Sequence, residues 1–431
     1  MMNAAGTRAP ARAAALIVMA VAAISCESGG GVTAPRAAEA FARFVVVGGD
    51  LSMGVQSGGI VNSSQAVSWP TVLAKAAGVE FRQPLFRSPG CTPPLVAPLL
   101  LGRRLSGTST TVRDSSCAGA LATELPPGAN LAIAGATAWA ALNLTPKAIA
   151  AAPGSFAASD RSRYPIVLGN TQSQVTAMMV KSPTFVAIEL GSSELINAVL
   201  TGQMIVASSY AQAGAWTFAP PALFSSVFAA VADSAAKLGV KAVVLSVPHL
   251  TRLPAFRTGA ALWVDRAALT AYGVSLDANC NGSSNLVNAA GRVTALALRA
   301  VASGQLQPLS CANVPNAADQ ILEPGDVATL DAAVDQMNAQ ISQVAQARGW
   351  AYVNVDEVLA TMIADAGAFT TRFHLTCTSP YGAYFSLDGI RPGARGQTLL
   401  AEAVAAAINA RYGLDIPIRG EALEIHPAPC S

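Results

Sequence analysis

Five short apolar runs are the feature that most restricts how this chain can fold. Each run ends in glycine or a polar residue, and stretches with helical spacing separate the runs. Continuous apolar runs without alternation are typical of strands buried on both faces of a parallel sheet. The sequence therefore predicts an α/β domain of three layers, α/β/α, with a mostly parallel central sheet. The runs begin at Phe44, Asn130, Thr184, Val240 and Ala351.

Two long segments interrupt this alternation of strands and helices. Helical spacing is found in 69–78, 221–238, 326–348 and 394–412. Segments 80–125 and 255–325 are too long to be simple connections, and each carries two cysteines. We interpret both as loop insertions that disulfides hold over the crevice at the carboxyl ends of the strands, where ligands bind in such sheets.

The N-terminus has the pattern of an export signal. Residues 1–25 contain two arginines and then an apolar run that is too short for a membrane span of about 20 residues. The ending "AAISC" resembles a bacterial lipobox, in which Cys26 would carry the lipid, and ordinary signal-peptidase cleavage is the alternative. Glu27 after the cysteine favours the outer membrane, with residues 26–40 as a flexible linker. We expect an exported lipoprotein facing the periplasm or the cell surface.

Composition and charge exclude some classes of partner. The hydrophobic content of 52% supports a sizeable core, which we assign to residues 41–420, followed by a tail over 421–431. Two of the 27 basic side chains lie in the leader, so 25 remain against 25 acidic ones. A neutral mature protein argues against nucleic acid as a partner.

Six cysteines remain once Cys26 is set aside. An even number in an exported protein indicates disulfides, and proximity in sequence favours Cys91 with Cys117 and Cys280 with Cys311. Cys377 with Cys430 follows by elimination. A metal site is the rival interpretation, but the chain has no C-x-x-C pair and its three histidines are scattered. The sequence specifies no metal, nucleotide or redox cofactor.

Four blocks at the predicted strand ends resemble the SGNH hydrolases, also called the GDSL esterase and lipase family, and in particular their exported bacterial lipoprotein branch. The blocks are "GGDLSMGVQSGG", "NLAIAGAT", "ELGSSELINAVLTG" and "FSLDGIRPGARGQTLLAEA", and the resemblance spans about 44–417. It implies a flavodoxin-like fold and ester hydrolysis. The chemistry of that family needs a serine nucleophile, a histidine base oriented by an aspartate, and donors that hold the oxyanion.

Three of the five functional positions implied by the resemblance have changed. Asp50 occupies the serine position, Ser193 the asparagine position and Arg391 the histidine position. Gly135 and Asp388 are retained. Arginine cannot act as a general base because it stays protonated.

The first block can be aligned in two registers, and neither provides a serine. Anchoring on Gly48 places Asp50 at the serine position, whereas anchoring on Gly49 places Leu51 there. In the first register Asp50 and Arg391 should face each other across the crevice, because serine and histidine at those places share a hydrogen bond. We therefore predict an ion pair between them, which Asp388 could join.

Substitute catalytic groups are the alternative. Ser52 or Asp50 could serve as a shifted nucleophile, with His374 or His249 as the base. The plainer interpretation is a turn serine and structural histidines. His426 lies in the tail and is expected only to pack there.

Two functional hypotheses follow from these positions. The first is a catalytically impaired envelope lipoprotein that binds or supports a partner: an acylated or carbohydrate ligand, or an envelope protein. The second is an active carboxylic-ester hydrolase, either an esterase or lipase or an acyl-modifying enzyme.

Overall fold

The computed structural model describes residues 37–110, 116–121, 128–210, 216–315, 317–365 and 375–418. Its central sheet has the order β1, β2, β3, β9, and every neighbouring pair is parallel. Four of the five apolar runs form these strands, so the predicted α/β class is confirmed. The strands are β1 (Phe44–Gly48), β2 (Phe185–Glu189), β3 (Lys241–Leu245) and β9 (Ala351–Val353).

The fifth run, which begins at Asn130, lies along β1 without forming a full ladder. It makes a single parallel bridge with Val46. The amide of Leu131 donates to the Val46 carbonyl and that of Ile133 donates to the Gly48 carbonyl. The Nδ2 atom of Asn130 donates to the carbonyl of Ser52 at 2.9 Å. This run therefore also holds the short helix that follows β1.

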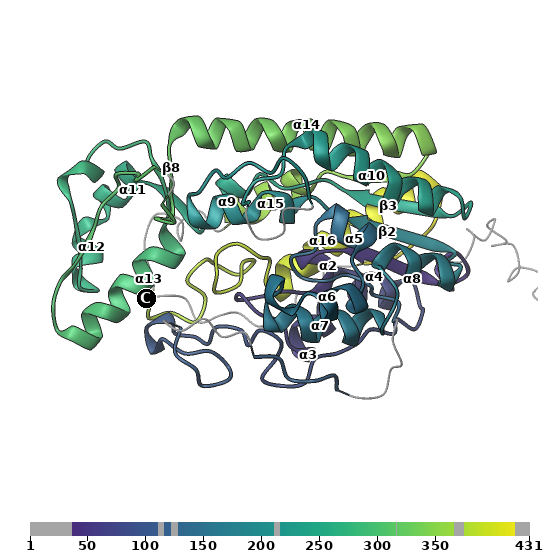
Figure 1. The fold of residues 1–431 in the computed structure, drawn as a ribbon, viewed down its shortest axis with the longest axis horizontal. Coiled ribbons are helices and arrows are strands. Elements are labelled where there is room, and N and C mark those ends of the chain that lie inside the picture. The colour runs from purple at the N-terminus through teal and green to yellow at the C-terminus, as the bar shows by residue number, and fades with distance from the viewer. Residues whose placement is uncertain are drawn as a thin grey trace, which may run out of the picture.

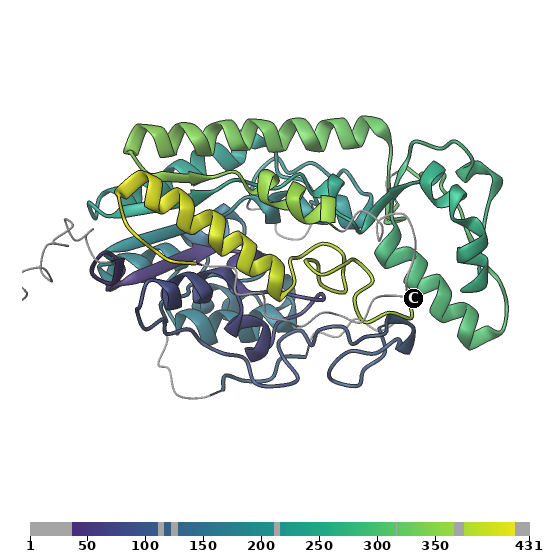
Figure 2. The same ribbon diagram turned by 180° about the vertical axis from the view of Figure 1, so that it is seen from behind.

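Helices cover both faces of the sheet and form the expected three layers (Figures 1 and 2). One face carries a connected set in which α10 contacts α14, α5 and α8, and the other carries α16 in contact with α4 and α15. The first set is α5 (Ala138–Asn143), α8 (Gln174–Lys181), α10 (Pro221–Ala236) and α14 (Pro324–Arg348). The second set is α4 (Trp69–Ala76), α15 (Val355–Asp365) and α16 (Ala394–Tyr412).

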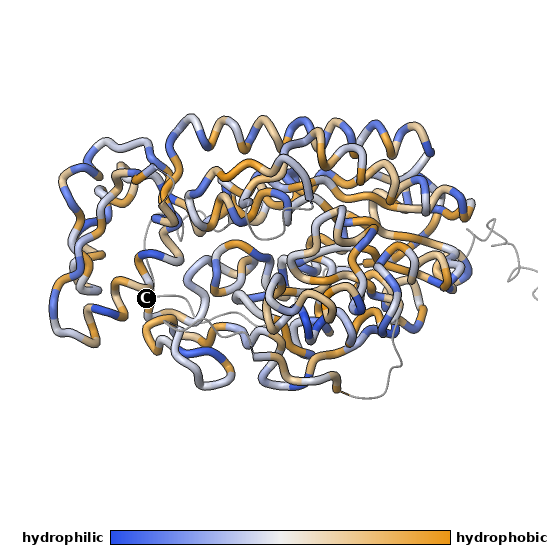
Figure 3. Tube along the Cα trace, viewed as in Figure 1, coloured by the Kyte–Doolittle hydropathy of each residue, from blue (hydrophilic) through white to orange (hydrophobic). Residues whose placement is uncertain are grey.

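The sequence pattern explains why these helices dock on the sheet. Figure 3 shows the central strands as continuous apolar segments, whereas α14 alternates between hydrophilic and hydrophobic turns. In α16 the buried residues Leu400, Val404 and Ile408 recur every four positions, which places them on one helical face. The remaining helices of this part are α1 (Ala37–Ala40), α2 (Asp50–Met53), α3 (Asn62–Ala66), α6 (Pro146–Ala151), α7 (Ala158–Leu168) and α9 (Ile196–Thr201).

Helix α1 changes one predicted boundary. The flexible linker was expected to reach residue 40, but its last four residues are helical and Ala37 is buried. The reason is the fully buried Phe41, whose ring stacks on Phe185 of β2 at 4.4 Å between centroids and so anchors the chain that precedes it. Cys26 and the export signal lie outside the described residues.

The first insertion is mostly irregular, and the second is a folded unit. Disulfides join Cys91 to Cys117 and Cys280 to Cys311, as proximity favoured. Cys377 is also disulfide-bonded, while Cys430 lies outside the described residues.

Segment 255–325 extends from one end of the molecule (Figure 1). Its elements are β4 (Phe256–Thr258), α11 (Gly259–Val264), α12 (Arg266–Ala271), β5 (Val274–Leu276), β6 (Leu286–Asn288), α13 (Ala289–Ser303), β7 (Gln307–Leu309) and β8 (Ile321–Leu322).

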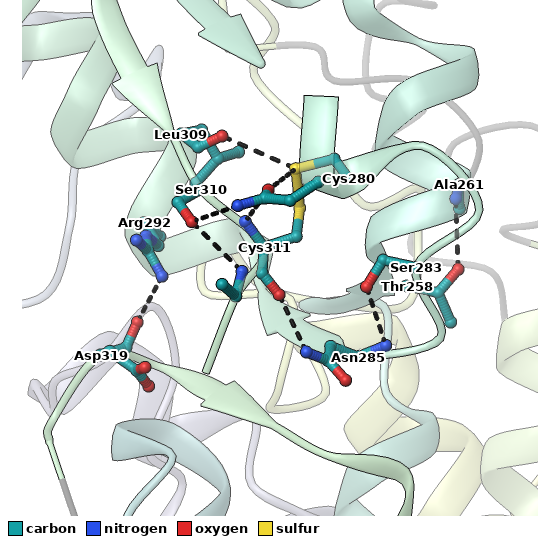
Figure 4. The surroundings of a disulfide bond; sticks show 12 residues. Thr258, Ala261, Cys280, Ser283, Asn285, Arg292, Leu309, Ser310, Cys311 and Asp319 are labelled. Carbon is teal, nitrogen blue, oxygen red and sulfur yellow. Dashed lines mark hydrogen bonds between the residues drawn. A yellow bond between two sulfur atoms is a disulfide. The ribbon is translucent and has the colours of Figure 1, made fainter. Parts of the chain in front are cut away.

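Polar contacts surround the disulfide of this second unit (Figure 4). Asn285 Nδ2 donates to the carbonyl of Cys311 at 2.9 Å, and Arg292 Nη1 donates to that of Asp319 at 2.6 Å. The small sheets pair β4 with β6 and β8, and β5 with β7. No helix among the described residues is both long and apolar enough to cross a membrane.

Removal of the second disulfide should loosen its unit selectively. In the chain-entropy model, closing a loop of this length stabilises a protein by about 3–4 kcal/mol. We expect Cys280→Ser combined with Cys311→Ser to accelerate tryptic cleavage within 255–325, measured by mass spectrometry. The matched pair Cys91→Ser with Cys117→Ser should leave those cleavage rates near the wild-type values. Equal effects of the two pairs would contradict this assignment.

Candidate functional site

The site begins where β1 ends. Gly48 is the last residue of β1, and Asp50 is the first residue of α2. A Cβ on Gly48 would lie 2.8 Å from Ser52 Oγ and 3.1 Å from the Glu189 carbonyl, so only glycine permits the strand to turn this sharply into the helix. The turn projects the Asp50 side chain over the carboxyl edge of the sheet, where Arg391 meets it.

Arg391 binds Asp50 through two nitrogens. Its Nη2 lies 2.5 Å and its Nε 2.9 Å from Asp50 Oδ2. The third nitrogen, Nη1, donates to Asp388 Oδ2 at 3.0 Å. Both side chains of the Asp50–Arg391 pair are about 15% exposed, so water screens this contact far less than it would on the surface. The predicted ion pair is present, and Asp388 joins it.

Asp388 is held as firmly as the arginine that it binds. Its Oδ1 accepts from Ser386 Oγ and from the amides of Ile390 and Arg391, at 2.9–3.0 Å. Its Oδ2 also accepts from the amide of Gly58 at 2.9 Å. Because Gly58 belongs to the first block and Asp388 to the last, this contact joins segments 330 residues apart in sequence.

The charges of the pair shift the pKa values of Asp50 and Arg391. Burial acts to raise the pKa of Asp50, but the charge and hydrogen bonds of Arg391, with the Gly135 amide, outweigh it and hold that pKa below its ordinary value. Burial likewise acts to lower the pKa of Arg391, and the two carboxylates outweigh it and raise that pKa. Both groups are therefore charged at neutral pH.

The ion pair occupies the place where the family resemblance implied that a substrate would react. The Gly135 amide, at the oxyanion-hole position of the resemblance, donates to Asp50 Oδ1 at 2.8 Å. Ser193 is buried and lies beside the turn, since a Cβ on Gly49 would be 3.7 Å from its hydroxyl. The cavity lined by Asp50, Ser193 and Arg391 has a volume of about 30 Å³. That volume is roughly the share of one water molecule in the liquid, so this crevice is closed to an ester.

Glu189 was not predicted as a site residue, although its carboxylate supports the turn that follows β1. This fully enclosed carboxylate ends β2 and accepts from the amides of Gly49 at 3.0 Å and Ser52 at 3.1 Å. Burial raises the pKa of Glu189 to about 7, although those amides oppose the shift. The signal available in the sequence was a charged residue at the end of an otherwise apolar strand, "FVAIE".

A second buried glutamate braces the third block. Glu194 Oε1 accepts from the amide of Ala138 at 2.7 Å and from the Tyr210 hydroxyl at 3.1 Å. Burial raises the pKa of Glu194 to about 7. The two glutamates hold three of the blocks together, because they link the ends of β1 and β2 with the start of α5.

Ser52 is not placed to act as a shifted nucleophile. It is fully buried, and its hydroxyl faces the backbone of Gly48 inside the turn instead of the crevice. A serine buried in this way cannot reach a substrate, so this candidate is corrected to a packing residue of α2. Successive residues of an α-helix point about 100° apart around its axis, so the residues that follow Asp50 in α2 do not share its direction.

Of the two histidine candidates, the structure describes only His249, and it does not line the crevice. His249 is buried, with Nδ1 2.5 Å from Asp356 Oδ2 and Nε2 3.4 Å from Asp335 Oδ1. The Asp356 hydrogen bond raises the pKa of His249. Its neighbours Pro248 and Leu250 line the small cavity, but His249 itself does not. His374 and His426 lie outside the described residues.

Fold and site together define a three-layer α/β protein with an ion pair at the carboxyl edge of its sheet, at the positions where the sequence resemblance implied a serine and a histidine. No protein-family profile matches the chain, and no curated protein matches it. Among solved structures, one similar chain is described as a GDSL-like lipase from Parabacteroides merdae, with 8% identity, a TM-score of 0.31, and coverage of 65% of this chain and 71% of that one. Another is a mutant acetyl-xylooligosaccharide esterase from Geobacillus, with 8% identity, a TM-score of 0.33, and coverage of 86% and 94%.

The ion pair should contribute measurably to stability. We expect Arg391→Met to lower the free energy of unfolding by about 3 kcal/mol, because it leaves two largely buried carboxylates without their cation. Adding Asp50→Asn should recover part of the loss, since the amide removes one of the unpaired charges. Denaturant titration measures both effects. Arg252→Met, which removes an exposed arginine paired with Asp331, is the matched control and should cost less than about 1 kcal/mol. Equal losses for the two arginines would contradict the assignment.

Glu189 should make stability fall as pH rises. Its pKa is about 7 in the folded protein and near 4.5 when unfolded, so between these values the folded state holds a proton that the unfolded state has lost. We expect the free energy of unfolding to decrease from about pH 4.5 to pH 7, and Glu189→Gln to flatten that decrease. Asp50 acts in the opposite sense, because its depressed pKa removes stability only below about pH 4. Unfolding measured at pH 5 and pH 8 tests the first effect, and an unchanged slope in the variant would contradict it.

Proposed function

We propose that this chain is a non-catalytic, SGNH-like protein of the cell envelope that acts by binding or by supporting a partner. The observation that carries the proposal is the ion pair between Asp50 and Arg391, which stands at the positions of the nucleophile and the base. Hydrolysis by this family's chemistry needs an uncharged nucleophile activated by a group that accepts its proton. An arginine that binds two carboxylates provides no such acceptor.

The location in the envelope is part of the same proposal. It is supported by the export signal, by Cys26 in its lipobox-like context, and by the disulfides, which form and persist in oxidising compartments. We propose attachment to the outer membrane through a lipid on Cys26. The partner classes that suit such a protein are an acylated or carbohydrate ligand, or another envelope protein.

An active ester hydrolase is the competing function, and its requirements are not met at this site. A nucleophilic Asp50 would need a second group to release the covalent ester, and its carboxylate already accepts from Arg391 and from Gly135. Ser52 would need to leave the interior of the turn. The ion pair therefore favours the non-catalytic function.

Activity measurements test this proposal directly. The wild-type chain should hydrolyse p-nitrophenyl acetate only at the background rate and should not react with a fluorophosphonate probe. The variant Asp50→Ser with Arg391→His restores the serine and histidine of the family and frees the Gly135 amide for an oxyanion, so it should exceed the wild type. We expect a low rate, since a missing oxyanion donor costs about 10² to 10³ in kcat.

A matched variant separates true activity from contamination. Ser52→Ala leaves the ion pair intact and removes the one serine of α2. Labelling of the wild type that disappears in Ser52→Ala would overturn the proposal.

A further inference from the structure

A second cavity lies beside the closed crevice. It has a volume of about 240 Å³, against about 30 Å³ for the crevice. Leu387 and Asp388 line only the larger cavity, Arg391 lines only the smaller one, and Ile390 lines both. The loop that carries Asp388 thus forms a partition, and the larger cavity opens on the side that the two insertions build.

The walls of this cavity are mostly apolar. Leu95 and Leu99 come from the first insertion, Leu298 from α13 of the second, and Leu200 from α9. Sites for drug-sized ligands begin at about 300 Å³, so this cavity takes a smaller molecule, of about ten non-hydrogen atoms. A flexible hydrocarbon chain fits such a lining, because each buried methylene contributes about 0.8 kcal/mol.

Two threonines also belong to the lining, Thr294 on α13 and Thr110 on the first insertion. Their Oγ1 atoms are buried and do not face the space, so the polar end of a ligand must be recognised by other side chains.

The charges around the cavity indicate the chemical class of the polar end of the ligand. Arg103 and Arg104 line it, and Arg103 is exposed and forms no ion pair within the described part of the chain. Asp388 also lines the cavity, but its oxygens accept from the guanidinium and amide of Arg391 and from three other donors, so its charge is already compensated. An anionic head group suits this arrangement, since a free arginine binds carboxylates through paired hydrogen bonds.

The wall is preformed. Helix α13 is capped by Asn288, whose Oδ1 accepts from the Gly291 amide at 3.1 Å. Arg292 of the same helix is tied to Asp319, and the unit is closed by the disulfide of Cys280 and Cys311 (Figure 4). A rigid wall lowers the entropy that a ligand must overcome on binding.

We infer that this cavity binds a short fatty-acid-like carboxylate, with its chain among the leucines and its head at Arg103. The inference rests on the proposed function, because it gives the binding protein a ligand. It makes no use of the crevice. Hydrolysis by the wild type would overturn the proposed function without touching this site, and absent binding would overturn this site alone.

Calorimetry of the whole mature chain with straight-chain carboxylates tests the inference. From butanoate to octanoate the affinity should rise about threefold or fourfold for each added methylene, and then level off once the cavity is full. Octanol should bind more weakly than octanoate because it lacks the charge. No saturable binding of octanoate at millimolar concentration, or an affinity independent of chain length, would overturn the inference.

Variants locate the binding site. Leu298→Trp should abolish octanoate binding by filling the cavity, and Ala295→Trp, at another lining position of α13, provides the same test if the first variant fails to fold. Val301→Trp on the same helix is the matched control, because Val301 is 70% exposed and lies outside the lining. Equal binding by the filled variants and the control would overturn the assignment of the site.

Charge reversal tests the head group. Arg103→Glu should weaken octanoate about fivefold or more and should strengthen octylamine, whereas Arg299→Glu, on the exposed part of α13 outside the lining, should change neither. A fall in octanoate affinity without the gain in octylamine would contradict an anionic head at Arg103.

Discussion

The guanidinium of Arg391 is the group on which the arrangement of the carboxyl edge depends. It binds Asp50 after β1 and Asp388 before α16, so one cation connects the beginning and the end of the domain. Each carboxylate has further donors of its own, from Gly135 in one case and from Gly58 and Ser386 in the other. A buried cation with two anions around it has few alternative positions, because moving any one of them would leave an unpaired charge out of water.

The same geometry explains why the crevice is closed while a neighbouring cavity is open. Asp50 accepts from the amide of Gly135, the residue that the resemblance placed in an oxyanion hole, and Arg391 lies between Asp50 and the loop of Asp388. Beyond that loop, the cavity between the two insertions and the domain is lined mainly by leucines, with Arg103 as an exposed cation. A charge pair at one place and a ligand-sized space at another suit the proposed protein, which binds and does not cleave.

Much of the fold was predictable, because buried parallel strands leave an unmistakable pattern. The strands at Phe44, Phe185, Lys241 and Ala351 and the helices α10, α14 and α16 lie where the apolar runs and helical spacing indicated. The run at Asn130 was predicted as a strand, but the segment that contains it makes only three backbone hydrogen bonds to β1. Such a segment has the same apolar sequence pattern as a full strand, so the sequence does not distinguish the two. The internal structure of 255–325 was also missed, because strands of two or three residues are too short to show any periodicity.

The sequence alone determined the α/β class, two disulfide pairs, and the complementary charges at positions 50 and 391. These depend on residue type and order, which a linear pattern records. Only the tertiary structure decided that Ser52 points inward, that His249 pairs with Asp356, that Glu189 supports the turn, and that the insertions enclose a cavity. Those outcomes depend on contacts between residues that lie up to several hundred positions apart in sequence. Whether such residues meet in space is decided by the packing of the whole fold and not by the local sequence.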